Sequence, residues 1–250
     1  GYTGITYDIT DYLRYGRENV IVVRVDATQY EGWFYEGAGI YRHVWLNQYN
    51  PVHMDDNPVF IYTKVKKDMA EIFIETTVVN ESLKPSSITV SSLITDRNGY
   101  TIGQTRQEPV TLGINEKKTI KQQLTVHKPR LWTLEDPYLY RVIPLVKSNG
   151  TITDSDKFRF GIRTIDVKPD GLFLNGKHIK IKGTNNHQDH AGVGSALPDY
   201  LHYYRIFLLK QMGSNAYRSS HNPPTPELLD ACDSLGMLVM DENRLLNSSP

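Results

Sequence analysis

Apolar and polar side chains alternate in short runs over roughly the first two-thirds of the chain. Residues 72–78 place isoleucine, threonine or valine at every second position, and residues 88–94 and 120–126 alternate in the same way. A period of two is typical of a strand that buries one face of a sheet. Runs of β-branched and aromatic residues at 20–25 and 41–46 predict two further strands. Short strands of this kind indicate a β-sandwich.

Turn signals separate these runs. Asn-Gly pairs stand at residues 98–99, 149–150 and 175–176. A type I′ turn requires positive φ at both central residues, which Asn and Gly adopt at low cost, so each pair predicts a hairpin. A polar stretch flanked by prolines, residues 51–58, predicts a boundary between two β units.

The pattern changes after residue 163, where strands and helices begin to alternate. Strands are predicted at 179–184, 214–218 and 237–241, with helices at 200–212 and 225–235. This order predicts a parallel sheet with right-handed crossovers, the start of a barrel.

Both predicted helices carry an apolar stripe. Thr225 is expected to cap the second helix, with Pro226 at its first position and Gly236 as its stop. Cys232 lies on the stripe of this helix, so we expect a core residue and not a reactive thiol. The predicted stripes are Leu201, Tyr204, Leu208 and Met212 in the first helix, and Leu228, Leu229, Cys232 and Leu235 in the second.

Each predicted parallel strand is followed by polar residues, at 185–190, 218–222 and 241–243. The ligand site of a parallel barrel lies at the carboxyl ends of its strands, so these three clusters are expected to meet in one site. Position alone also allows ordinary hydrogen bonding at the rim of the barrel.

Other chemistries fit these clusters poorly. His187, His190 and His221 could be taken for a zinc set, but nothing near them matches H-E-x-x-H. The serines at 219–220 lack the G-x-S-x-G elbow of a serine hydrolase. Asp241 and its neighbour Glu242 point in different directions, so they cannot flank one glycosidic bond, and a salt bridge inside the barrel is expected for at least one of them.

Composition excludes several classes of partner. Lysine plus arginine and aspartate plus glutamate both number 28, which gives no electrostatic footprint for nucleic acid or an anionic membrane. No run approaches the roughly 20 apolar residues of a membrane span. A single cysteine rules out an internal disulfide. The sequence leaves open the compartment and whether the intact protein forms a homo-oligomer.

Residues 182–187 read K-G-T-N-N-H, and residues 215–224 read N-A-Y-R-S-S-H-N-P-P. They resemble the first- and second-strand barrel motifs of glycoside hydrolase family 2, and of its β-galactosidases in particular, and residues 227–242 continue the match. Residues 39–44 resemble the end of its jelly-roll domain, and 129–140 its immunoglobulin-like domain.

The resemblance implies an interior piece of a multidomain β and α/β protein. Residues 1–54 would be the C-terminal part of a jelly-roll sugar-binding domain, 55–165 an immunoglobulin-like β-sandwich, and 166–250 the N-terminal part of a (β/α)8 TIM barrel.

The resemblance also implies where the catalytic residues lie. Retaining hydrolysis needs two carboxyl groups about 5–5.5 Å apart. In this family both are glutamates on later barrel strands, the fourth and the seventh. The acid/base and the nucleophile are therefore expected C-terminal to Pro250, and no catalytic residue is expected within this chain.

A substrate pocket is implied as well. His187 and His221 match histidines that bond sugar hydroxyls, and Arg218 matches an arginine beside the nucleophile. Asn186 is assigned to the same pocket. His43 stands where related enzymes have an aspartate that reaches the sugar and a sodium ion, so we assign His43 to the pocket and expect no sodium site. For each residue a hydrogen-bonded place in the barrel is the alternative.

The predicted ligands follow from these matches. Leu246 and Ser248 occupy the family's magnesium-ligand positions, so no metal or other cofactor is expected. The expected partner is a carbohydrate, with hydrolysis of terminal β-galactosides as the leading function. A β-glucuronidase or β-mannosidase is the alternative within the family, and a non-catalytic carbohydrate-binding or adhesive sandwich module is the alternative outside it.

Overall fold

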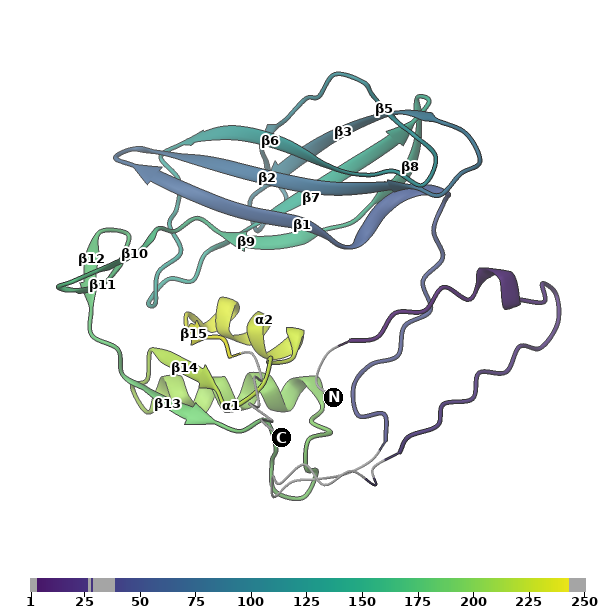
Figure 1. Cartoon of the computed structure of the whole chain (residues 1–250). Coiled ribbons are helices and arrows are strands. Elements are labelled where there is room, and N and C mark those ends of the chain that lie inside the picture. The colour runs from purple at the N-terminus through teal and green to yellow at the C-terminus, as the bar shows by residue number, and fades with distance from the viewer. Residues whose placement is uncertain (1–3, 27, 29–38, 243–250) are drawn as a thin grey trace.

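The computed structural model describes residues 4–26, 28 and 39–242. Figure 1 shows a β-sandwich on one side of the molecule and a unit of parallel strands and helices on the other, with a small hairpin sheet between them. The N-terminal segment extends beside both. Neither described α-helix has the length and apolar character needed to cross a membrane.

Two antiparallel sheets form the sandwich, in the orders β1-β2-β6 and β4-β3-β7-β8, with β5 paired to β3 and β9 paired to β7. β1 runs through the boundary predicted between residues 54 and 55, with a register shift between Met54 and Val59. The strands are β1 Val52–Lys66, β2 Met69–Asn80, β3 Ser86–Thr95, β4 Thr101–Gln104, β5 Val110–Leu112, β6 Lys117–His127, β7 Leu139–Ser148, β8 Thr151–Ser155 and β9 Phe158–Gly161.

The predicted alternation is confirmed inside the sandwich. The alternating residues of β2 and β3 are fully buried, including Ile72, Ile74, Ile88 and Ile94. Their burial removes apolar area from water, which is the main stabilising contribution to such a core. Polar contacts also cross this core: Ser92 Oγ donates to Gln122 Oε1 at 2.7 Å, and Gln122 Nε2 donates to the Val90 backbone oxygen at 2.9 Å.

All three Asn-Gly pairs form hairpin turns, but one is of a different type. Asn149 and Gly150 both have positive φ, at 49° and 85°, and the pair at 175–176 does the same. At 98–99 only Gly99 has positive φ. There the Asp96 carboxylate accepts from the backbone N–H groups of residues 98 and 100, at 2.9 and 2.8 Å, and so stabilises a longer loop.

Beyond the sandwich, three strands and two helices begin a parallel barrel. The strand order is β13-β14-β15, all parallel, as predicted. The small hairpin sheet precedes them. The elements are β10 Ile165–Lys168, β11 Gly171–Leu174, β12 Lys177–Ile179, β13 Gly183–Asn186, α1 Asp199–Gln211, β14 Ala216–Ser219, α2 Pro226–Leu235 and β15 Leu238–Met240.

The caps of α2 are confirmed, whereas the stripe of α1 was wrong. Thr225 Oγ1 accepts from the Leu228 N–H at 3.2 Å, and Gly236 ends the helix with a φ of 74°. Cys232 is buried, and burial raises the pKa of its thiol to about 12, as expected of a core residue. The buried residues of α1 are His202 and Ile206. The apolar residues of α1 are spread around the whole helix, so their spacing alone could not select the buried face. Tyr204, Leu208 and Met212 of the predicted stripe are exposed.

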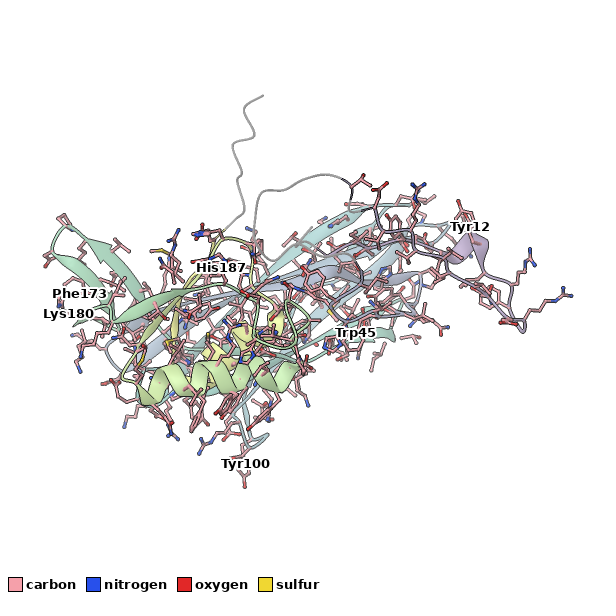
Figure 2. The ribbon with its side chains drawn as sticks, turned by 90° about the horizontal axis from the view of Figure 1, so that it is seen from below. Tyr12, Trp45, Tyr100, Phe173, Lys180 and His187 are labelled. Atoms are coloured by element: carbon pink, nitrogen blue, oxygen red, sulfur yellow. The ribbon has the colours of Figure 1, made fainter. Side chains whose placement is uncertain are left out.

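Residues 4–26 and 39–51 contain one short 3-10 helix, Thr10–Tyr12, and no strand. The strands predicted at 20–25 and 41–46 are therefore wrong for this chain. Their β-branched and aromatic side chains find no partner strand among the described residues, and Val22 is 86% exposed and Trp45 75% exposed. Tyr12 lies toward the outer end of this segment (Figure 2). Assignment of residues 1–54 to a jelly roll stays a prediction.

A tryptophan joins the sandwich to the parallel unit. Trp132 is fully buried and packs with Leu174 and Leu238, and its Nε1 donates to the backbone oxygen of Asp233 at 2.8 Å. Next to it, Lys210 Nζ donates to the backbone oxygens of Leu134 and Gly236, at 2.9 and 2.8 Å. These contacts lie at the carboxyl ends of α1 and α2, so the sandwich docks at the amino ends of the parallel strands.

Candidate active site

The opposite edge of the parallel sheet carries the predicted site. Asn186 of β13 pairs with Ser219 of β14, and Arg218 pairs with Met240 of β15. This register brings the carboxyl ends of the three strands side by side. Lys180 and His187 lie at the two ends of the segment that contains β13, with His187 toward the middle of the molecule (Figure 2).

Two of the predicted histidines meet at this edge. The His187 and His221 rings lie 5.4 Å apart between centroids and are nearly perpendicular, at 85°. The Ser220–His221 peptide bond is cis. A neutral imidazole donates through one nitrogen and accepts through the other, so the two rings can bond hydroxyl groups that donate and hydroxyl groups that accept.

Glu242, which follows β15, contacts two predicted site residues. One carboxylate oxygen lies 2.8 Å from His221 Nδ1, and the other forms an ion pair with Arg218 Nη2 at 2.8 Å. The Glu242 N–H donates to Ser219 Oγ at 3.0 Å. The hydrogen bond with His221, followed by the charge of Arg218, lowers the pKa of Glu242. The salt bridge expected of the pair at 241–242 is thus formed by Glu242.

An arginine holds the loop after β13. Arg205, on α1, donates to the backbone oxygens of His187 and Gln188, at 2.6 and 3.2 Å. The buried Gln188 side chain accepts from Arg42 Nη2 at 3.1 Å. These bonds tie the loop to a barrel helix and to the segment before the sandwich, which restricts the position of His187.

The Asn186 side chain bonds within its own strand. Its Nδ2 donates to the backbone oxygen of Thr184 at 3.0 Å and to the Thr184 hydroxyl at 2.8 Å. Its backbone oxygen accepts from the Ser220 N–H at 3.1 Å. The contacts of Asn186 therefore organise the strand end.

His43 contacts the starts of both helices. Its Nε2 lies 2.8 Å from Asp199 Oδ1 and 3.6 Å from Glu227 Oε1. The hydrogen bond with Asp199 and the Asp199 charge raise the pKa of His43. Within the described residues, none of its contacts involves His187, His221, Arg218 or Asn186.

The described residues contain one group that could hold a metal ion, and it includes none of the three histidines considered as a zinc set. The potential ligand atoms of His43, Asp199 and Glu227 lie within 4.8 Å of one another. A His–carboxylate ion pair explains this geometry without an ion. Leu246 and Ser248, which stand where related enzymes have magnesium ligands, lie outside the described residues.

The resemblance implies two catalytic glutamates C-terminal to Pro250, and Pro250 itself lies outside the described residues. Their place beyond Pro250 therefore stays a prediction. Among the described strand ends of the parallel sheet, the carboxylate of Glu242 is held by His221 and Arg218. This contact is the salt bridge expected for one member of the pair at 241–242.

A β-sandwich that leads into the first strands of a parallel barrel, with a polar site at their carboxyl ends, defines a multidomain (β/α)-barrel protein. Residues 52–163 match the family described as glycosyl hydrolases family 2, and residues 165–248 match the TIM barrel domain of that family. The chain belongs to glycosyl hydrolases family 2.

Similar proteins carry two activities in their names. The β-galactosidase BoGH2A of Bacteroides ovatus is 39% identical over 245 residues, which are 97% of this chain and 29% of that protein. A family 2 member from Bacteroides cellulosilyticus has a TM-score of 0.89 at 39% identity, over 94% of this chain and 33% of the solved one. The β-glucuronidase of Bacteroides uniformis has a TM-score of 0.76 at 31% identity, over 85% and 27%. The chain thus spans about a third of their length.

Two features of the site were not predicted from the sequence. A salt bridge was expected for the pair at 241–242, but its partners were not, because they depend on the register of three strands. Arg205 and Gln188 were not identified as the residues that hold the loop after β13. A basic residue on a helix that follows a polar loop was the one available signal, and such residues are common on exposed faces.

Proposed function

We propose that the full-length protein is a retaining glycoside hydrolase that removes terminal β-D-galactosyl groups from oligo- or polysaccharides. In this proposal the chain contributes part of the substrate pocket, and the two catalytic carboxylates belong to other strands of the barrel. The observation that carries it is the perpendicular pair His187 and His221 at the carboxyl ends of β13 and β14, where a barrel places its ligand.

The charge of the site supports a neutral sugar. A glucuronide brings a carboxylate that a free cation would have to bind. At the described strand ends, Arg218 is already paired with Glu242 at 2.8 Å. A galactoside needs hydroxyl partners instead, which imidazole rings can supply.

The proposal is tested by comparing nitrophenyl β-galactoside, β-glucuronide and β-mannoside as substrates of the full-length protein. We expect the highest kcat/KM for the galactoside. A preference for the glucuronide would assign the protein to the other activity found among its relatives. Binding of oligosaccharides without turnover of any of the three would indicate a non-catalytic module.

His221→Ala in the full-length protein is expected to lower kcat/KM at least tenfold. Loss of one hydrogen bond to a sugar hydroxyl costs on the order of 1–3 kcal/mol, which is about 10- to 100-fold in rate. The prolines at 223–224 restrict the backbone of the loop, so the protein should still fold. His127→Ala, on an exposed position of β6, is the matched control. A lower melting temperature with unchanged kinetics would make His221 a residue of barrel stability alone.

We propose further that the enzyme requires no metal ion. Chelation of the full-length protein with EDTA is expected to leave most of its activity, because leucine and serine stand at positions 246 and 248 and neither side chain is a magnesium ligand of the usual kind. The measurement is turnover before and after dialysis against EDTA. A large loss that added magnesium restores would contradict the prediction, and His43→Ala would then test the group of His43, Asp199 and Glu227.

A further inference from the structure

Glu242 occupies a central place among the polar side chains at the strand ends. It contacts both His221 and Arg218, and each of its carboxylate oxygens serves a different partner. Its side chain is 23% exposed, and its backbone N–H is bound to Ser219 of the neighbouring strand. Glu242 is therefore held by contacts of both its backbone and its side chain.

The contact with His221 determines where the imidazole carries a proton. An ionised carboxylate accepts hydrogen bonds and has no proton to give, so Nδ1 of His221 must be the donor. In the neutral ring Nε2 then carries the acceptor lone pair. A histidine without this partner would divide between two tautomers, and only one of them presents an acceptor through Nε2.

The contact between Glu242 and Arg218 restricts the orientation of the guanidinium and offsets its positive charge. A guanidinium has several N–H donors in a fixed plane, so a carboxylate at one nitrogen restricts the direction of the others. Ion pairing also removes the net positive charge that an unpaired Arg218 would bring to the strand ends. Glu242 thereby couples two side chains that come from β14 and the loop after it.

We propose that Glu242 is a positioning residue, which holds His221 in the tautomer that accepts through Nε2 and holds Arg218 in a fixed orientation. This role rests on the proposed function, because it concerns the same pocket. In this role Glu242 forms no bond with the sugar; one of its oxygens contacts His221 and the other is in an ion pair with Arg218.

The first test uses Glu242→Gln in the full-length protein. The Gln carbonyl can accept from His221, but its NH2 group then faces the Arg218 guanidinium, donor against donor, so the pair separates. We expect kcat/KM for nitrophenyl β-galactoside to fall at least tenfold while the melting temperature stays near that of the parent. Asp230→Asn is the matched control, because it removes an exposed ion pair with Arg159, which contributes little to stability.

The second test separates positioning from packing. In Glu242→Ala, millimolar formate should enter the vacated space and restore part of the lost activity, with free galactose as the product. Formate should have no effect on Asp230→Ala. A glycosyl formate product would show that Glu242 itself reacts with the sugar, and it would overturn the positioning role.

The remaining outcomes are also decisive. Parent-like kinetics in Glu242→Gln, with or without a lower melting temperature, would overturn the inference and leave Glu242 with a structural role. If the unmodified full-length protein hydrolysed no β-glycoside, the proposed function would fail first. That failure is distinguishable, because it is seen in the parent protein before any variant is compared.

Discussion

The 250-residue chain, expressed alone, is expected to hydrolyse nitrophenyl β-galactoside no faster than buffer. Retaining hydrolysis needs two carboxyl groups about 5–5.5 Å apart, one of them protonated as the acid. Among the described strand ends, Glu242 cannot be that acid, because its pKa is lowered and it remains ionised at neutral pH. Its oxygens also face His221 and Arg218, not open space. The loss relative to the full-length protein should therefore be complete within detection.

The measurement compares equal molar amounts of the isolated chain and the full-length protein, with circular dichroism to verify that the chain retains its strands. Turnover by the pure chain would contradict the prediction, and with it the expectation that both catalytic glutamates follow Pro250. If Glu242→Gln then abolished that turnover, the chemistry would have to be assigned to Glu242, against both the proposed function and the positioning role.

Trp132→Ala is expected to destabilise the chain by on the order of 3–5 kcal/mol, the usual cost of removing a buried aromatic side chain. Trp132 is fully buried: it contacts Leu174 and Leu238, and the Arg163 guanidinium lies 4.5 Å from its ring centre. Its removal leaves a cavity and also frees the backbone oxygen of Asp233 from its donor.

The free energy of unfolding in urea measures this effect, and Trp45→Ala is the matched control because Trp45 is 75% exposed. A surface substitution of that kind should change stability by no more than about 0.5 kcal/mol. Equal unfolding midpoints for the two variants would show that Trp132 does not hold the two units together.

Features that depend on local sequence were predictable. The alternation of β2 and β3 reports burial on one face of a sheet, and the capping residues Thr225 and Gly236 act within a few residues of their own positions. The chain order of strands and helices also predicted the parallel sheet, since short crossovers allow few other arrangements.

Features that depend on distant partners were not predictable. Residues 20–25 have the composition of a strand, but a strand needs a neighbour with which to share hydrogen bonds. The inner face of α1 depends on where α2 packs, because its apolar residues are spread around the helix. The contacts of Glu242 with Arg218 and His221 required the register of three strands, which no spacing within the sequence specifies.

The contact between the sandwich and the parallel unit at Trp132 has a consequence for the order in which the parts of the chain fold. Gly236 approaches the sandwich so closely that a Cβ there would lie 2.5 Å from the backbone oxygen of Leu134. Every sandwich strand, from residue 52 to residue 161, is synthesised before α1 and α2. Domains generally fold as units from the N-terminus during translation. The finished sandwich can thus serve as a template on which the first helices of the nascent barrel settle before later segments emerge.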